Sequence, residues 1–198
     1  MALTVLDTVL CDIGDVIIRF DPATAKAIER EHGLVEGSLL PAALKSRHGQ
    51  LAMTGAIGHD AWRKEVGAVL GDGAVEDWLA YHGEVDTDVV GHLKTVRDRG
   101  VRVILLSNAT SRLREDLAFH GLLDVADLVL CSAEMNLVKP DPRCYREAAR
   151  LGGFTLEKTL YVDDTPSWVA AGTALGLTGH VFTCAQALHT CLESEGLL

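Results

Sequence analysis

The stretch VRVILLSNATSRLREDLAFHG (residues 101–121) combines an apolar run, a short polar turn and an amphipathic segment. Residues 101–108 predict a buried strand, and residues 111–121 predict a helix that ends at Gly121. A strand followed directly by a helix is the repeating unit of sheets whose strands run parallel. This stretch therefore predicts an α/β protein, provided that the same unit recurs elsewhere in the chain.

The strand-then-helix pattern does recur along the chain. Apolar runs predict further strands in the run that ends at Asp12 and in residues 128–132, 159–164 and 179–183. Segments between or after them predict helices over residues 86–100, 141–153 and 165–176. The last of these has Thr165 as its N-cap and Pro166 in its first turn. The pattern predicts a Rossmann-like parallel sheet with helices on both faces.

The segment from about residue 20 to residue 88 lacks this alternation. Glycine-terminated helical patterns occupy residues 22–33, 39–49, 59–71 and 74–83, with no strand pattern between them. We interpret this segment as a small helical cap inserted into the α/β pattern after its first strand. The predicted domains are a cap over residues 19–89 and a catalytic core formed by residues 1–18 and 90–198.

The overall composition excludes several classes of partner. A formal net charge of −10 argues against a surface that binds nucleic acid or an anionic membrane. No apolar run approaches the roughly 18 residues needed to cross a bilayer. The five cysteines are scattered without a C-x-x-C pair, as is typical of reduced thiols. We therefore expect a cytoplasmic protein, and the sequence does not indicate its oligomeric state.

Polar side chains follow the predicted strands at the points where the strands end. The residues concerned are Asp12, Ser107 with Asn108, Lys139, and Asp163 with Asp164. Each of them taken singly is better explained as a helix cap or a solvated loop residue. Ligands of open parallel sheets bind outside the carboxyl ends of the strands. Taken together, these polar residues therefore predict one binding site. Carboxylate oxygens suit Mg²⁺, and the ammonium and hydroxyl groups suit an anion.

Four motifs resemble the successive motifs of the haloacid dehalogenase-like (HAD) hydrolases, in that family's order. They are CDIGDV (11–16), LLSNAT (105–110), LVKPDPRCYREAARLGG (137–153) and YVDDTPSWVAAGTALG (161–176). The resemblance covers roughly residues 1–18 and 90–185, and the helical block stands where that family carries its first type of cap. The resemblance implies a small phosphorylated metabolite as substrate.

By this resemblance Asp12 is the nucleophile and forms an aspartyl-phosphate. The resemblance also implies that Mg²⁺ is held by Asp12, the backbone carbonyl of Gly14 and Asp164, with Asp163 close by or acting through water. A cation is needed because a carboxylate and a phosphate dianion repel each other.

The remaining site residues are implied to bind the phosphoryl group. Ser107 and the backbone amide of Asn108 would donate hydrogen bonds to its oxygens. Lys139 would neutralise charge on the phosphoryl group and on Asp12. As a loop residue, Lys139 is expected to contribute little to stability.

The sequence departs from the usual phosphatase pattern at Gly14. Phosphatases of the family usually carry a second aspartate there as general acid and base, whereas here Asp15 follows one residue later. A subset that includes bacterial α-glucose-1-phosphate phosphatase is similar in its Asp-x-Gly pattern, which makes a sugar phosphate a candidate substrate. We expect Asp15 to stabilise the loop rather than to donate the proton.

The sequence thus predicts a Mg²⁺-dependent phosphomonoester hydrolase, with two alternatives. The first is a 2-haloacid dehalogenase, which needs no metal; the pair Asp163–Asp164 argues against it. The second is a catalytically weak binding or regulatory protein with the same fold, an alternative that Gly14 keeps open.

Overall fold

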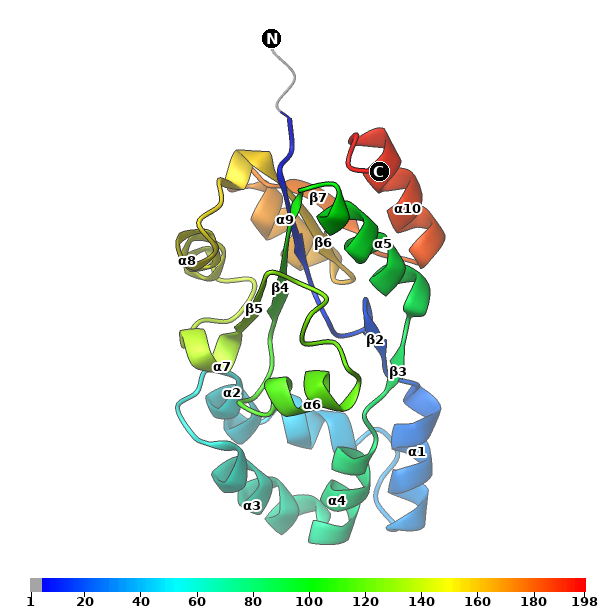
Figure 1. Cartoon of the computed structure of the whole chain (residues 1–198). Coiled ribbons are helices and arrows are strands. Elements are labelled where there is room, and N and C mark those ends of the chain that lie inside the picture. The colour runs from blue at the N-terminus through cyan, green and yellow to red at the C-terminus, as the bar shows by residue number, and fades with distance from the viewer. Residues whose placement is uncertain (1–4) are drawn as a thin grey trace.

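The central strand of the fold is β1 (Thr8–Cys11), as seen in a computed structural model that describes residues 5–198 (Figure 1). Five strands form one sheet in the order β5-β4-β1-β6-β7, and every paired neighbour is parallel. The other four strands are β4 (Arg102–Ser107), β5 (Leu128–Cys131), β6 (Thr159–Asp163) and β7 (Thr178–Val181). The predicted parallel sheet is confirmed.

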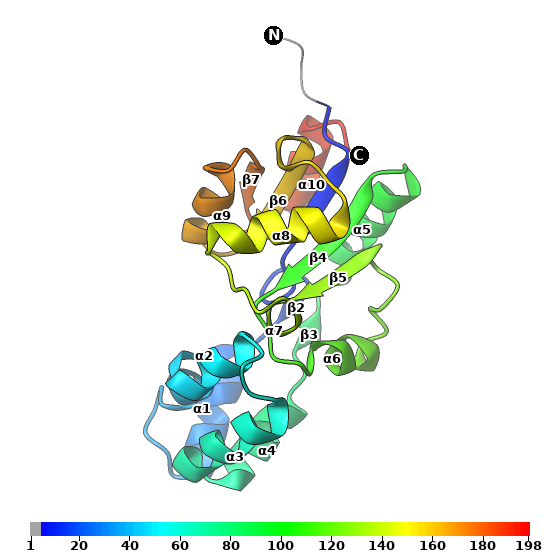
Figure 2. The ribbon, with the colours of Figure 1, turned by 90° about the vertical axis from the view of Figure 1, so that its left-hand side faces the viewer.

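Helices cover both faces of this sheet (Figure 2). Helices α5 (Thr87–Asp98) and α10 (Ala185–Ser194) pack on one face, while α8 (Pro142–Gly152) and α9 (Pro166–Thr173) pack on the other. Two shorter helices, α6 (Leu113–Phe119) and α7 (Ser132–Met135), follow β4 and β5. The expected Rossmann-like arrangement is therefore present. Within residues 5–198, no helix combines the length and the apolar character needed to span a membrane.

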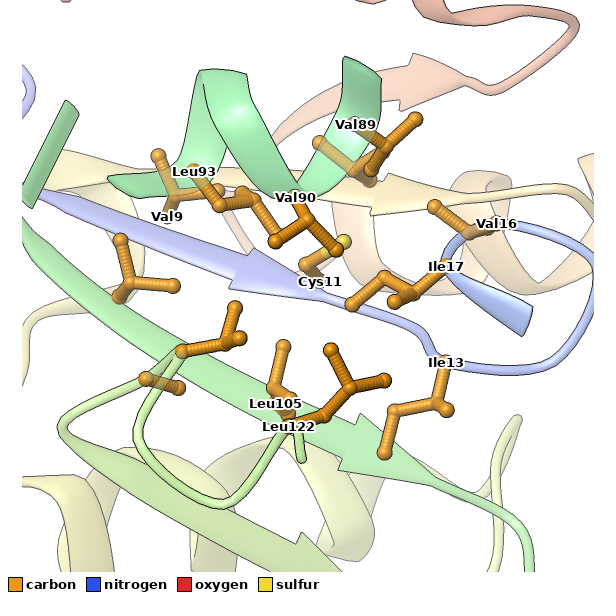
Figure 3. Close-up of a cluster of buried hydrophobic side chains, with 14 of the residues drawn as sticks. Val9, Cys11, Ile13, Val16, Ile17, Val89, Val90, Leu93, Leu105 and Leu122 are labelled. Atoms are coloured by element: carbon orange, nitrogen blue, oxygen red, sulfur yellow. The ribbon is translucent and has the colours of Figure 1, made fainter. Parts of the chain in front are cut away.

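Alternate residues of β1 fill the two faces. Val9 and Cys11 lie against Val89 and Leu93 of α5 (Figure 3), whereas Leu10 packs on the opposite side of the sheet with the α8 helix. Successive side chains of a strand point to opposite faces, so a strand covered on both faces must be apolar throughout. Burial on both faces therefore explains the uninterrupted apolar run from which this strand is predicted.

The apolar run around Asp12 is divided rather than continuous. β1 ends at Cys11, and the amides of Ile17 and Ile18 donate to the carbonyl of Ile13, which turns the chain back. Ile13 and Ile17 are buried in the same cluster as Cys11 (Figure 3). The chain then enters β2 (Ile18–Arg19), which pairs antiparallel with β3 (Glu84–Val85). The sequence analysis did not predict this two-stranded ribbon.

Between β2 and β3 the chain forms a helical block with its own apolar core around Trp62 (Figure 1). Its elements are α1 (Pro22–Glu31), a π-helical turn (Pro41–Lys45), α2 (Arg47–Met53), α3 (His59–Leu70) and α4 (Asp72–Ala80).

The helix predicted over residues 39–49 is wrong in one respect. Ser46 is extended, and its hydroxyl accepts a hydrogen bond from the amide of Gly49, so a new helix begins there. Gly49 lies inside α2, where a Cβ would collide with the carbonyl oxygen of Ala43. It serves close packing rather than helix termination.

Candidate functional site

Three carboxylates meet where β1 and β6 end. One oxygen each of Asp12, Asp163 and Asp164 lie within 4.8 Å of one another. The parallel register pairs Cys11 with Val162, and the amide of Asp12 donates to the carbonyl of Val162 at 2.9 Å. Adjacent strands therefore deliver Asp12 and Asp163 side by side, and Asp164 follows directly.

Lys139 reaches into this cluster from the segment that precedes α8. Its Nζ lies 2.9 Å from Oδ1 of Asp12 and 2.7 Å from Oδ2 of Asp163, under the ring of Trp168. Only 2% of the residue is exposed. Lys139 lies in a turn, as expected of a loop residue, but it is buried. The expectation that it contributes little to stability is therefore wrong, because removing one partner of a buried ion pair leaves the other charges unpaired.

The side chain of Asn108 holds the backbone of Lys139 in place. Nδ2 of Asn108 donates to the carbonyl of Lys139, and the Lys139 amide donates to Oδ1, both at 2.8 Å. This contact with Lys139 is not among the roles that the sequence predicts for Asn108, which are a helix cap and a backbone amide donor. Its side chain aligns the Lys139 segment with the carboxyl end of β4.

Asp163 is fully buried and accepts three hydrogen bonds. Oδ2 accepts from Lys139 and from the hydroxyl of Tyr161 at 2.5 Å, and Oδ1 accepts from the Thr165 amide at 2.9 Å. Tyr161 is not among the site residues predicted from the sequence, although strand alternation places residues 161 and 163 on the same face.

Thr165 occupies the N-cap position of α9 as predicted, but its hydroxyl does not cap the helix. The hydroxyl instead donates to Oδ1 of Asp164 at 3.2 Å. Thr165 therefore orients one of the three clustered carboxylates.

The charges in the cluster are unbalanced. Burial raises the pKa of the Asp12 carboxyl to about 6, an effect that Lys139 opposes. Burial, together with the neighbouring Asp163, also raises the pKa of Asp164. Burial acts to lower the pKa of Lys139, but Asp12 and Asp163 outweigh it and hold that pKa above its ordinary value. Three carboxylates face one ammonium, so the donor set fits a further hard cation such as Mg²⁺.

Gly14 and Asp15 lie in the turn after Asp12 and have different surroundings. A Cβ built on Gly14 would meet no atom of residues 5–198 within 4 Å, so the position is open. Asp15 is exposed in a left-handed conformation with φ of 54°, and its Oδ1 accepts from the amide of Phe20 at 3.1 Å. The carboxylate of Asp15 is thus engaged in the turn.

A cavity of about 530 Å³ joins this edge of the sheet to the helical block. Asp12, Gly14, Ser107, Asn108 and Asp164 line its charged end. Side chains of the helical block line much of the rest. The volume lies within the usual range for a small-molecule site.

Comparisons with known proteins agree on one family. The family described as haloacid dehalogenase-like hydrolase matches residues 6–176. A protein named phosphatase MT3486 from Mycobacterium tuberculosis is 30% identical over 120 residues, which cover 59% of this chain and 55% of that protein. A phosphoserine phosphatase from Thermus thermophilus is 38% identical over 84 residues, which cover 42% of this chain and 34% of that protein. The matched part is thus about half or less of each relative.

Solved structures share the fold. The HAD family enzyme BT-2542 of Bacteroides thetaiotaomicron aligns with a TM-score of 0.79 at 18% identity, covering 90% of this chain and 94% of that one. Another structure of the same enzyme, a complex with magnesium and inorganic phosphate, aligns with a TM-score of 0.73 at 17% identity.

Proposed function

Because the chain belongs to the haloacid dehalogenase-like hydrolase family, we propose that it is a Mg²⁺-dependent phosphomonoester hydrolase with Asp12 as nucleophile. The observation that carries the proposal is the buried contact of Lys139 with both Asp12 and Asp163 beside Asp164. A carboxylate that must approach a phosphate dianion needs this density of positive charge. The names of the phosphatase relatives support the same reaction class.

The reaction proceeds in two displacements. A carboxylate oxygen of Asp12 forms a bond to phosphorus while the bond from phosphorus to the alcohol oxygen breaks, and the alcohol takes a proton from water. Water then attacks the aspartyl-phosphate, which releases inorganic phosphate and restores the Asp12 carboxylate. Lys139 stabilises the negative charge on the transferring oxygens in both steps, and Trp168 covers its ammonium group.

The candidate metal ligands differ in how many hydrogen bonds their oxygens already accept from the protein. Both oxygens of Asp163 already accept hydrogen bonds, which suits it to positioning Lys139 and to reaching the metal through water. Asp12, Asp164 and the carbonyl of Gly14 are the proposed direct ligands. Bound there, Mg²⁺ would reduce the repulsion between the nucleophile and the phosphate.

Ser107 and the Asn108 amide complete the phosphoryl site as hydrogen-bond donors at the end of β4. The helical block, proposed as a cap over residues 19–89, supplies the far walls of the cavity. The proposed substrate is therefore a small phosphorylated metabolite whose organic part extends towards this block.

The decisive test combines metal removal with a change of the nucleophile. We expect a chelator to abolish release of phosphate from p-nitrophenyl phosphate, and added Mg²⁺ to restore it. Asp12→Asn should lower kcat by about 10⁴-fold or more, because the variant keeps the shape of the side chain and loses the nucleophile.

The matched control is Asp15→Asn, since Asn tolerates the left-handed conformation and Asp15 acts in the turn. Substantial phosphatase activity in Asp12→Asn would refute the assignment. Metal-independent release of chloride from 2-chloropropionate would identify a dehalogenase instead.

A further inference from the structure

We propose that the organic part of the substrate is an apolar ring or branched hydrocarbon rather than a sugar. This inference rests on the proposed phosphatase function and names the substrate class of the same site. It comes from the cavity beyond the carboxylate cluster, whose lining has a chemical character that the sequence analysis did not predict.

The far part of the cavity is walled by apolar and aromatic side chains. We call the following set the apolar wall: Phe20, Leu40, Leu44, Trp62, Trp78 and Leu79. Leu113 of α6 and Trp168 of α9, outside the helical block, line the same cavity. All three tryptophans of the chain thus contact this space.

Several polar atoms near the apolar wall are engaged with the protein itself. Nε1 of Trp62 donates to the carbonyl of Ala43 at 2.9 Å. Arg112 pairs through Nε with Asp116 at 3.1 Å and donates to the Leu79 carbonyl. His82 lies 3.3 Å from the same Asp116 carboxylate. Arg112, Asp116 and His82 thus use part of their charge and hydrogen-bonding capacity on one another and on the backbone.

The apolar wall itself carries no polar side-chain atoms other than the indole N–H groups of Trp62 and Trp78, and that of Trp62 is already engaged. The Tyr81 hydroxyl already accepts from the amide of Asp21 at 3.0 Å and retains one hydrogen to donate. Nδ1 of His59 is buried without a partner among residues 5–198. A sugar ring that packs against the apolar wall would therefore bury hydroxyls for which the wall has no partners. Each hydroxyl buried without a partner weakens binding by roughly tenfold, whereas an apolar ring of the same size gains from leaving water.

A matched pair of esters tests the inference. Cyclohexylmethyl phosphate and glucose 6-phosphate are both primary esters beside a six-membered ring, and they differ mainly in the ring oxygen and hydroxyls. We expect kcat/KM for the cyclohexylmethyl ester to be higher by about 10²-fold, corresponding to two unpaired hydroxyls. An equal or higher kcat/KM for glucose 6-phosphate would overturn the inference.

Parallel assays separate failure of this inference from failure of the proposed function. If p-nitrophenyl phosphate is hydrolysed in a manner that requires Asp12, without preference for the apolar ring, only the substrate class is wrong. If no phosphate ester is hydrolysed, the proposed function is wrong and the inference falls with it.

A variant of the apolar wall supplies the second measurement. Leu40 lines the cavity and is 39% exposed, so Leu40→Gln should fold normally. We expect it to raise KM for cyclohexylmethyl phosphate by roughly tenfold and to leave inhibition by inorganic phosphate unchanged. Val35→Gln is the control, because Val35 is 79% exposed and lies outside the lining. Equal KM values in the two variants would contradict the role given to the wall.

Discussion

The carboxylate cluster and the apolar wall meet at one cavity but are built by different physical means. In the cluster, Asp12, Lys139 and Asp163 are fixed by strand register and by hydrogen bonds with short distances. In the wall, Leu44, Trp62 and Trp78 are placed by packing within the helical block. A buried polar network that loses one member becomes unfavourable as a whole, whereas apolar packing tolerates exchange of similar volumes. The carboxylate cluster is therefore rigidly specified, whereas the apolar wall can accept exchange of side chains of similar volume.

The most severe way to break the cluster is Lys139→Met, which removes the ammonium group and keeps most of the side-chain volume. We expect kcat to fall by about 10³-fold or more. The free energy of unfolding without metal should fall by about 3–5 kcal/mol, because buried carboxylates then lack a partner. Denaturant unfolding with and without Mg²⁺ measures this effect, and the cation should restore part of the loss.

Lys158→Met is the control for this variant, since Lys158 is exposed outside the cluster. Near-normal kinetics in Lys139→Met would show that Lys139 has only a structural role.

Gly14→Asp adds a carboxyl group at the border between the two regions. Without an acid at this position, the leaving alcohol lacks a positioned proton donor, so the wild-type rate should depend steeply on leaving-group pKa. Because a Cβ on Gly14 meets open space among the described residues, the variant should accelerate alkyl esters by about 10²-fold and aryl esters much less. The measurement is kcat/KM over a series of phosphate esters.

Gly91→Asp controls for the added charge, because Gly91 is equally open among residues 5–198 and lies on α5. A flat series in the wild-type protein would mean that another residue already donates the proton.

Tyr161→Phe is expected to have the smallest effect of these variants. It tests whether the hydrogen bond from Tyr161 to Asp163 contributes to turnover. Loss of the hydroxyl that donates to Asp163 should lower the free energy of unfolding by about 1 kcal/mol and kcat by roughly fivefold. Thr159→Val loses a comparable hydrogen bond at the opposite end of the same strand, to the carbonyl of Thr155 at 2.8 Å, and should leave kcat unchanged. Equal kinetic effects in both variants would show that Tyr161 acts only through stability.

The sequence predicts much of the fold because each signal that it uses is local. Buried parallel strands are continuous apolar runs, and Gly100 and Gly121 mark real helix ends with positive φ. The polar residues at strand ends could be recognised for the same reason. The prediction of a single helix over residues 39–49 is wrong because Ser46 starts a new helix, whereas the pattern places it inside one.

The remaining features of the site depend on tertiary contacts. The burial of Lys139 follows from how residues 137–141 cross the ends of the strands, and no periodicity encodes that path. Tyr161 and Trp168 are indistinguishable in sequence from ordinary core residues. The apolar wall depends on which helix faces turn towards the sheet, a property that the spacing of residues within each helix leaves open.

The central position of β1 also bears on how the protein is made. Thr8 pairs on one side with Arg102 and on the other with Thr159, so this strand emerges from the ribosome long before either partner exists. Until both arrive, its two hydrogen-bonding edges and its apolar side chains stay open to other chains. Pairing over such sequence distances also slows folding, because the intervening chain must first lose entropy. During synthesis, therefore, the strand that leads into the proposed nucleophile is exposed to aggregation until its partners have been made.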